Sequence, residues 1–286
     1  MKPDVQTHSH SSKQLNDGIL GGVGDEINRW LGCLDSFHKD RAFRELGQRS
    51  FRDLECLPLF NETYRLIGQN WDGQAARSKQ LWRWKPNPNC SEKRTEKSEV
   101  RLERAIIGLA SEGCLKFEDC DWANQMPTSS GLSPTIPGTR SNKNGPRNID
   151  LIRRRSPTEY DFIELKIADK HPLYAAMEIL CYAMLYIFCR EKKATLQIEN
   201  ANNRNLLCAN TVHLRVLAPV EFYQRCRVEW LSELETVFNR GIAQFAASKE
   251  SGLKMDFRFD QFPSGFQCTI PELQKALTGI QPVCSG

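Results

Sequence analysis

The chain has 286 residues, of which 40% are hydrophobic and 26% are charged, the composition of an ordinary globular protein. This balance excludes a chain that is disordered throughout, a collagen and a mucin-like stalk. Its 39 Lys and Arg residues against 35 Asp and Glu residues leave a formal charge of +4, which permits a nucleic-acid partner without requiring one. The longest apolar run, Ile179–Cys189, is too short to span a bilayer, and the N-terminus lacks the hydrophobic core of a signal peptide. We therefore expect a cytoplasmic protein without a membrane partner.

The 11 cysteines are spaced too widely for a zinc ribbon or finger. No two of them lie closer than six positions, so the chain has no Cys-x-x-Cys pair. Several, such as Cys181 and Cys189, stand inside apolar stretches, which predicts buried free thiols in a reducing compartment. A catalytic cysteine paired with His171 or His213 is the alternative, although no nearby residue in the sequence activates any of these thiols.

The N-terminal third of the chain predicts helices behind a flexible tail. The tail, residues 1–24, is polar and rich in Ser, His and Gly. Residues 25–69 place apolar side chains such as Ile27 and Leu31 at helical spacing, which predicts two or three helices. A basic and aromatic stretch follows and ends as a loop, so we expect residues 25–96 to form a helical region with a basic, aromatic linker.

From residue 97 onward the pattern changes to that of an α/β domain, expected over 97–286. The predicted elements are a helix over 98–113, strands over 115–122, 148–154 and 161–167, a helix over 172–190, a strand over 211–217, a helix over 219–247 and a strand over 253–259. A long loop rich in Pro, Gly and Ser is expected over 124–146. This order predicts an α/β fold with a mixed central sheet.

Two carboxylates and a lysine occupy the predicted hairpin of this domain. Asp150 lies on its first strand and Glu164 on its second. With a turn centred near Pro157, the two acids are direct cross-strand neighbours, about 5 Å apart at Cβ. Lys166 shares the face of Glu164 because alternate residues of a strand point the same way. Two carboxylates this close repel each other unless a cation lies between them, and a hard divalent metal takes such oxygen ligands.

Such a group suits metal-assisted hydrolysis of phosphodiesters. The metal would polarise the phosphate and lower the pKa of bound water, and the lysine would stabilise the charge that develops. The structural alternative is that Asp150 forms a salt bridge with Lys166 on a solvent-facing side of the sheet. The nearly continuous apolar character of both strands favours buried positions instead, where a charge needs a partner.

The spacing of Asp150, Glu164 and Lys166, followed by a helix, resembles the PD-(D/E)XK nuclease superfamily over about residues 98–211. The resemblance implies a restriction-endonuclease-like αβββαβ core, to which this chain adds its N-terminal helical region. It also implies Mg²⁺, with Mn²⁺ as the alternative, bound by both acids and by the backbone carbonyl of Leu165. Lys166 would serve catalysis together with the two acids. Ile149 stands where many members of the superfamily have proline.

The superfamily often adds an acid from the helix before the strands. Glu103 is the candidate for this metal ligand, with Glu99 as second choice one helical turn earlier. The alternative is that Glu103 is a surface acid paired with a neighbouring basic residue. Members related to recombination exonucleases carry Gln-x-x-x-Tyr on the following helix, and here Glu178 and Tyr182 occupy those places. The resemblance implies nucleic-acid contacts for both, and a packed aromatic seam is the structural alternative.

Basic and aromatic residues supply further candidates for binding nucleic acid. Arginines near the predicted metal site would suit a phosphate backbone, and a solvated turn is the alternative. Two tryptophans in the linker would stack on bases, or else dock the N-terminal helices onto the second domain. These candidates are Arg147, Arg153, Arg154, Arg155, Trp82 and Trp84.

Taken together, the sequence predicts a Mg²⁺-dependent nuclease that acts on DNA, with RNA as the alternative substrate. A catalytically inactive nucleic-acid binder on the same fold is a second hypothesis. A third is a protein-interaction module anchored by exposed tryptophans. A homodimer or a larger protein assembly is compatible with all three, because no dimer interface is legible in the sequence.

Overall fold

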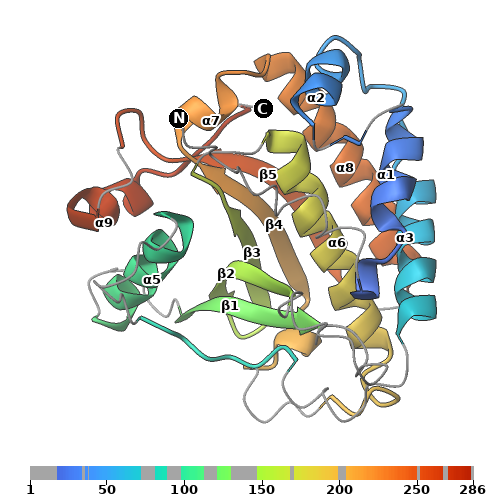
Figure 1. Ribbon diagram of the computed structural model, residues 1–286. Coiled ribbons are helices and arrows are strands. Elements are labelled where there is room, and N and C mark those ends of the chain that lie inside the picture. Colours follow the sequence, from blue (N-terminus) through green and yellow to red (C-terminus); the bar gives the residue numbers. More distant parts are fainter. Residues whose placement is uncertain are drawn as a thin grey trace, which may run out of the picture.

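A six-stranded mixed sheet with helices on both faces organises the protein (Figure 1). The strands lie side by side in chain order. Their bounds are β1 Asp121–Ser129, β2 Arg147–Ser156, β3 Glu159–Leu165, β4 Thr211–Ala218, β5 Lys254–Gln261 and β6 Gln281–Pro282. The computed structural model describes residues 18–33, 36–37, 39–71, 81–88, 98–112, 121–129, 147–167, 171–198, 204–249, 252–266 and 270–284.

The direction of each strand follows from the connection before it. β1, β2 and β3 are antiparallel neighbours, and β2 reaches β3 through a tight turn at 157–158. β3, β4 and β5 are parallel, because helices carry the chain back between them. β6 closes the edge antiparallel to β5. The expected α/β class with a mixed central sheet is confirmed.

The helices form one layer on each face of the sheet (Figure 1). Their bounds are α1 Val23–Leu31, α2 Asp40–Leu46, α3 Leu57–Asn70, α5 Ser98–Ser111, α6 Pro172–Glu191, α7 Val220–Tyr223, α8 Val228–Ser248 and α9 Ile270–Thr278, with short 3₁₀ turns at Gly18–Leu20 and Leu206–Cys208. The larger core joins α1, α3, α6 and α8 to one face of the sheet. A smaller core joins α5 and α9 to the other. The N-terminal helices therefore share a core with the α/β elements.

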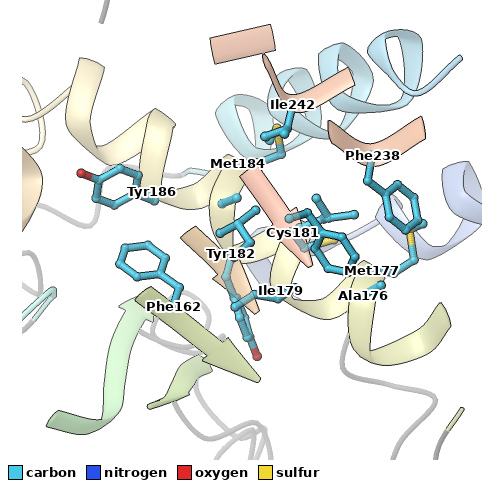
Figure 2. Packing of buried hydrophobic residues seen from close by; sticks show 14 of the residues in the cluster. Phe162, Ala176, Met177, Ile179, Cys181, Tyr182, Met184, Tyr186, Phe238 and Ile242 are labelled. Carbon is cyan, nitrogen blue, oxygen red and sulfur yellow. The ribbon is translucent and has the colours of Figure 1, made fainter. Parts of the chain in front are cut away.

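α6 is the central helix of the larger core, as its apolar sequence predicts. Its N-terminus is capped by His171, whose Nδ1 accepts a hydrogen bond from the backbone N–H of Tyr174 at 3.1 Å, and Pro172 stands in its first turn. Figure 2 shows its side chains packed against Phe238 and Ile242 of α8. The expectation that this apolar run is too short to span a bilayer is wrong, because the whole helix is long and apolar enough to do so by length and composition. That segment is entirely buried inside the protein.

Several sequence-based boundaries are wrong. The first strand, expected over 115–122, is β1 and enters the stretch expected to be a loop. The polar sequence of β1 does not predict a strand, because the strand forms only by pairing with β2, which is distant in the sequence. The last part of the expected tail is also ordered, since Leu20 and Val23 are fully buried. The rest of that tail, 1–17, and of that loop, 130–146, lie outside the described residues.

The helix expected over 219–247 is two helices, α7 and α8. The hydroxyl of Tyr223 lies within hydrogen-bond distance of two carbonyl oxygens, those of Val216 at 2.9 Å and Asp260 at 3.0 Å. These contacts fix α7 to the ends of β4 and β5, so the chain must turn before Trp230 of α8 can enter the core. The sequence analysis also missed α9 and β6, which follow the last predicted strand.

Candidate active site

Asp150 and Glu164 occupy facing positions at one end of the β2–β3 hairpin. Leu151 pairs with Ile163, so the next positions along the two strands are those of the acids, in the register that the sequence predicts. Oδ2 of Asp150 accepts a hydrogen bond from the backbone N–H of Leu165 at 2.9 Å. The side chain of Glu164 is buried. Lys166 is buried as well, whereas Asp150 is half-buried, so the alternative of a solvent-facing acid and lysine is wrong for Glu164 and Lys166.

Lys166 follows β3 directly and brings its ammonium group to Glu164. The two side chains form a buried ion pair. A second carboxylate comes from α6, where Oε2 of Glu178 lies 3.2 Å from Nζ of Lys166. The backbone N–H of Lys166 donates to the carbonyl of Leu217 on β4 at 3.0 Å, which fixes the chain at this point. The expectation that Glu164 and Lys166 share one face is confirmed.

α5 adds two more acids to the same end of the sheet. Glu103 is 1% exposed, so the alternative that it is a surface acid is wrong. Its Oε2 accepts a hydrogen bond from Nε2 of Gln125 at 2.6 Å, and Oε1 of Gln125 accepts one from Asn148 at 3.1 Å. Glu99 accepts a longer one from the backbone N–H of Ile167 at 3.3 Å. Gln125 and Asn148 were missed by the sequence analysis.

The acids around Lys166 raise one another's pKa values, because their negative charges lie close together. Burial, followed by the negative charge of Asp150, raises the pKa of Glu103 to about 9. Burial and the charge of Glu178 raise the pKa of Asp150 to about 6, against the opposing effect of Lys166. Burial, with the charges of Asp150 and Glu178, raises the pKa of Glu164 well above its usual range. The site thus carries more carboxyl groups than one ammonium can neutralise.

The ammonium group itself stays charged in this setting. Burial alone would lower the pKa of Lys166, but the negative charges of Glu164, Glu178 and Asp150 outweigh it and raise this pKa well above the usual value. A buried lysine with two carboxylates against it is a stable cation. It can therefore act on anionic groups near it but cannot serve as a base at neutral pH.

The residues fit a hard divalent cation. Oε2 of Glu164 is buried and receives no hydrogen bond from an N–H or hydroxyl donor among the described residues, while the carboxyl group of Glu178 lies next to that of Glu164. The surrounding donors are carboxylate oxygens, which Mg²⁺ and Mn²⁺ prefer. Within the described residues no three acidic, His or Cys side chains already converge as ligands on one point. Glu164 and Glu178 instead converge on the ammonium group of Lys166.

Tyr182 lies midway along α6, and Leu165 is the last residue of β3. Figure 2 shows the hydroxyl end of Tyr182 beside the arrowhead of β3, and its pKa is raised well above the usual value by burial and by the charges of Glu178 and Glu164. The aromatic ring is buried in the larger core. The Leu165 side chain belongs to the smaller core, which leaves its backbone as the part next to the acids.

The arginines of β2 are paired within the protein and do not form an open basic patch. Nε of Arg153 lies 2.5 Å from Asp161, and Nη2 of Arg155 lies 2.8 Å from the same buried carboxylate. Arg154 lies 3.6 Å from Asp121 on β1. Burial opposes ionisation of Asp161, but the two guanidinium groups lower its pKa below the usual value. Arg147 is half-buried at the first position of β2.

Trp82 and Trp84 are core residues, so the expectation that they stack on bases is wrong. Trp82 has no exposed surface, and its ring lies 5.4 Å from that of Tyr186 and 6.2 Å from that of Phe162. Trp84 is also buried, with its ring 6.3 Å from that of Tyr160. The backbone N–H of Trp82 donates to the carbonyl of Pro127 at 2.8 Å, which ties the linker to β1. These contacts dock the linker itself onto β1, β3 and α6.

All seven cysteines of the described residues are free thiols, and four of them are buried: Cys56, Cys181, Cys189 and Cys284. Cys33 and Cys226 are half-buried and Cys208 is exposed. Burial raises the pKa of Cys181 and of Cys189 to about 12, so both remain protonated. His171 caps α6, and the two ring nitrogens of His213 contact Asp256 and Glu159. Neither histidine is therefore the partner of a catalytic cysteine. In comparisons with family models, curated proteins and solved structures, no match to this chain was found.

Proposed function

We propose that the protein is a metal-dependent phosphodiester hydrolase, a nuclease that acts on DNA, with RNA as the alternative substrate. The observation that carries this proposal is the convergence of Asp150, Glu164 and Lys166 at one buried end of a hairpin, where no N–H or hydroxyl donor among the described residues reaches Oε2 of Glu164. A buried excess of acids destabilises a fold, so a cation that neutralises it is the simplest reason for its presence.

The order of elements around the site supports the same proposal. α5, β1, β2, β3, α6 and β4 follow one another as expected for a restriction-endonuclease-like core of the PD-(D/E)XK type. The acids lie on β2 and β3, and α5 and α6 approach them from either side of the hairpin end. The N-terminal helices pack behind α6 and support its position.

The chain's own residues divide the chemistry between them. Asp150, Glu164 and the carbonyl of Leu165 would hold Mg²⁺ or Mn²⁺, which when bound supplies charge for the phosphate and acidifies a water. The Lys166 ammonium, buried and permanently charged, stabilises negative charge on the attacking oxygen and on the phosphate. With a pKa of about 9, Glu103 carries a proton at neutral pH and accepts a hydrogen bond from Gln125. It would add negative charge to the site only when a bound cation lowers its pKa.

Cleavage assays with Lys166→Ala test this proposal. Wild-type protein and variant are incubated with supercoiled DNA, linear DNA and single-stranded RNA, each with Mg²⁺ or with chelator. We expect cleavage by the wild-type protein that needs the metal, and a loss of about 10²-fold or more in the variant, because one preorganised charge is removed from the site. Lys254→Ala, which changes an exposed lysine at the start of β5, is the matched control.

Two outcomes decide against the proposal. Cleavage by Lys166→Ala at the wild-type rate would remove the lysine from the mechanism. Wild-type protein that binds DNA without cutting any of the substrates, in Mg²⁺ or Mn²⁺, would favour the inactive nucleic-acid binder on the same fold. The interaction module anchored by exposed tryptophans loses its main support, because no tryptophan among the described residues is exposed.

A further inference from the structure

Glu178 is a lone charge on an otherwise apolar helix. Between Pro172 and Cys189 every other residue of α6 is uncharged, and all of them are buried. An acid in such a position costs folding free energy unless a partner compensates for it. Its carboxylate lies 3.2 Å from Nζ of Lys166, and this contact joins α6 to the end of β3. Glu178 is thus the one acid in the buried part of α6, and it reaches the lysine of the site.

Lys166 therefore contacts two carboxylates, and only one of them, Glu164, is a proposed metal ligand. Its ammonium group pairs with Glu164, which the proposed function assigns to the cation, and with Glu178, which comes from a separate element. A cation bound by Glu164 would compete with the ammonium group for that carboxylate, because like charges repel at short distance. The lysine would then keep only one of its two anionic partners.

Resting on the proposed function, we propose that Glu178 is a positioning residue that retains and neutralises the Lys166 ammonium when a divalent cation takes over Glu164. The placement of the charged groups supports this role. The carboxyl groups of Glu164 and Glu178 both contact the one ammonium group of Lys166, and Asp150 faces Glu164 across the hairpin. Without Glu178, the site would hold one carboxylate fewer, and the ammonium group of Lys166 would have no second anionic partner when a cation binds Glu164.

The test is Mn²⁺ binding measured by calorimetry on wild-type protein, Glu178→Gln, Lys166→Met and the double variant. We expect Glu178→Gln to bind Mn²⁺ about tenfold more weakly or worse, since it leaves the ammonium uncompensated. The double variant restores the net charge of the wild-type site, so its affinity should return to within about threefold of wild type. Lys166→Met alone should bind more tightly. Glu191→Gln, an exposed acid at the end of α6, is the control.

Each other result overturns the inference in a distinct way. A double variant that binds as weakly as Glu178→Gln would make Glu178 a direct ligand of the cation. A Glu178→Gln protein with wild-type affinity would leave it no role at the site. Wild-type protein that binds no Mn²⁺ would refute the proposed function itself, before the question of Glu178 arises. If Glu178→Gln does not fold, Glu178→Asp is measured in its place. It keeps the neutralising charge, so its Mn²⁺ affinity should stay within about threefold of wild type, and a loss of about tenfold or more would overturn the inference.

Discussion

Neutralising Glu103 should stabilise the metal-free protein in a pH-dependent way. Glu103→Gln keeps the size of the side chain and an oxygen that can accept the hydrogen bond from Gln125, but it removes the ionisable group. The folded pKa of about 9 lies far above the ordinary value of 4.5, so folding at pH 7 requires the uptake of a proton. That raised pKa makes the carboxyl a source of instability at neutral pH.

The size of the effect follows from linkage. Because the folded pKa is raised, the protonated carboxyl makes its full contribution to the free energy of unfolding below pH 4.5. This contribution is lost as the pH rises towards 9. At pH 7 the loss is about 3 kcal/mol, taken as an order of magnitude from the 1.36 kcal/mol that corresponds to each pKa unit. Glu103→Gln should therefore gain up to about this much stability at pH 7 and almost nothing at pH 4.

Urea unfolding in chelator, at pH 4 and at pH 7, measures this difference. Glu55→Gln changes an exposed acid and serves as the control, with an expected change within about 0.5 kcal/mol at either pH. A gain for Glu103→Gln that is equal at both pH values would assign it to packing, not to charge. No gain at pH 7 would refute the account of a strained acidic site.

Two further predictions concern residues outside the acidic site. Trp82→Ala should lower the free energy of unfolding by about 3–5 kcal/mol, since the ring is fully buried against Phe162; a folded variant that loses only DNA affinity would contradict its place in the core. The pKa of His213 is raised by a hydrogen bond to Asp256 and, against the effect of burial, by a second one to Glu159. The charged histidine therefore contributes stability to the fold, and this contribution is complete below its unfolded pKa of 6.5. This contribution is lost as the pH rises through the folded pKa, so unfolding curves of His213→Gln should approach those of wild type above that value, and a constant difference would refute this.

The hairpin of the site is predictable because its determinants are local. The turn near Pro157 sets the register of the two strands, and this register places Asp150 against Glu164. The lysine two residues further on follows from the same alternation. These parts need no information from distant segments, and the structure reproduces them.

Other parts of the site depend on long-range packing. Gln125 lies in a strand whose polar sequence resembles a loop, and only its pairing with β2 brings it to Glu103. Trp82 is flanked by basic residues, a composition typical of a nucleic-acid contact, yet its burial depends on β1 and α6. Glu178 did carry a local signal, because a lone charge within an apolar helix requires a partner. The sequence did not indicate that this partner is Lys166.

The proposed function requires that Asp150 and Glu164 hold a divalent cation beside Lys166. This requirement is tested by calorimetric titration of metal-free protein with Mn²⁺, repeated on Asp150→Asn and Glu164→Gln. We predict saturable binding by the wild-type protein and a loss of about 10-fold or more in affinity in each variant, because each removes one anionic ligand of the ion. Absence of binding by the wild-type protein, or undiminished binding by Glu164→Gln, would contradict this requirement.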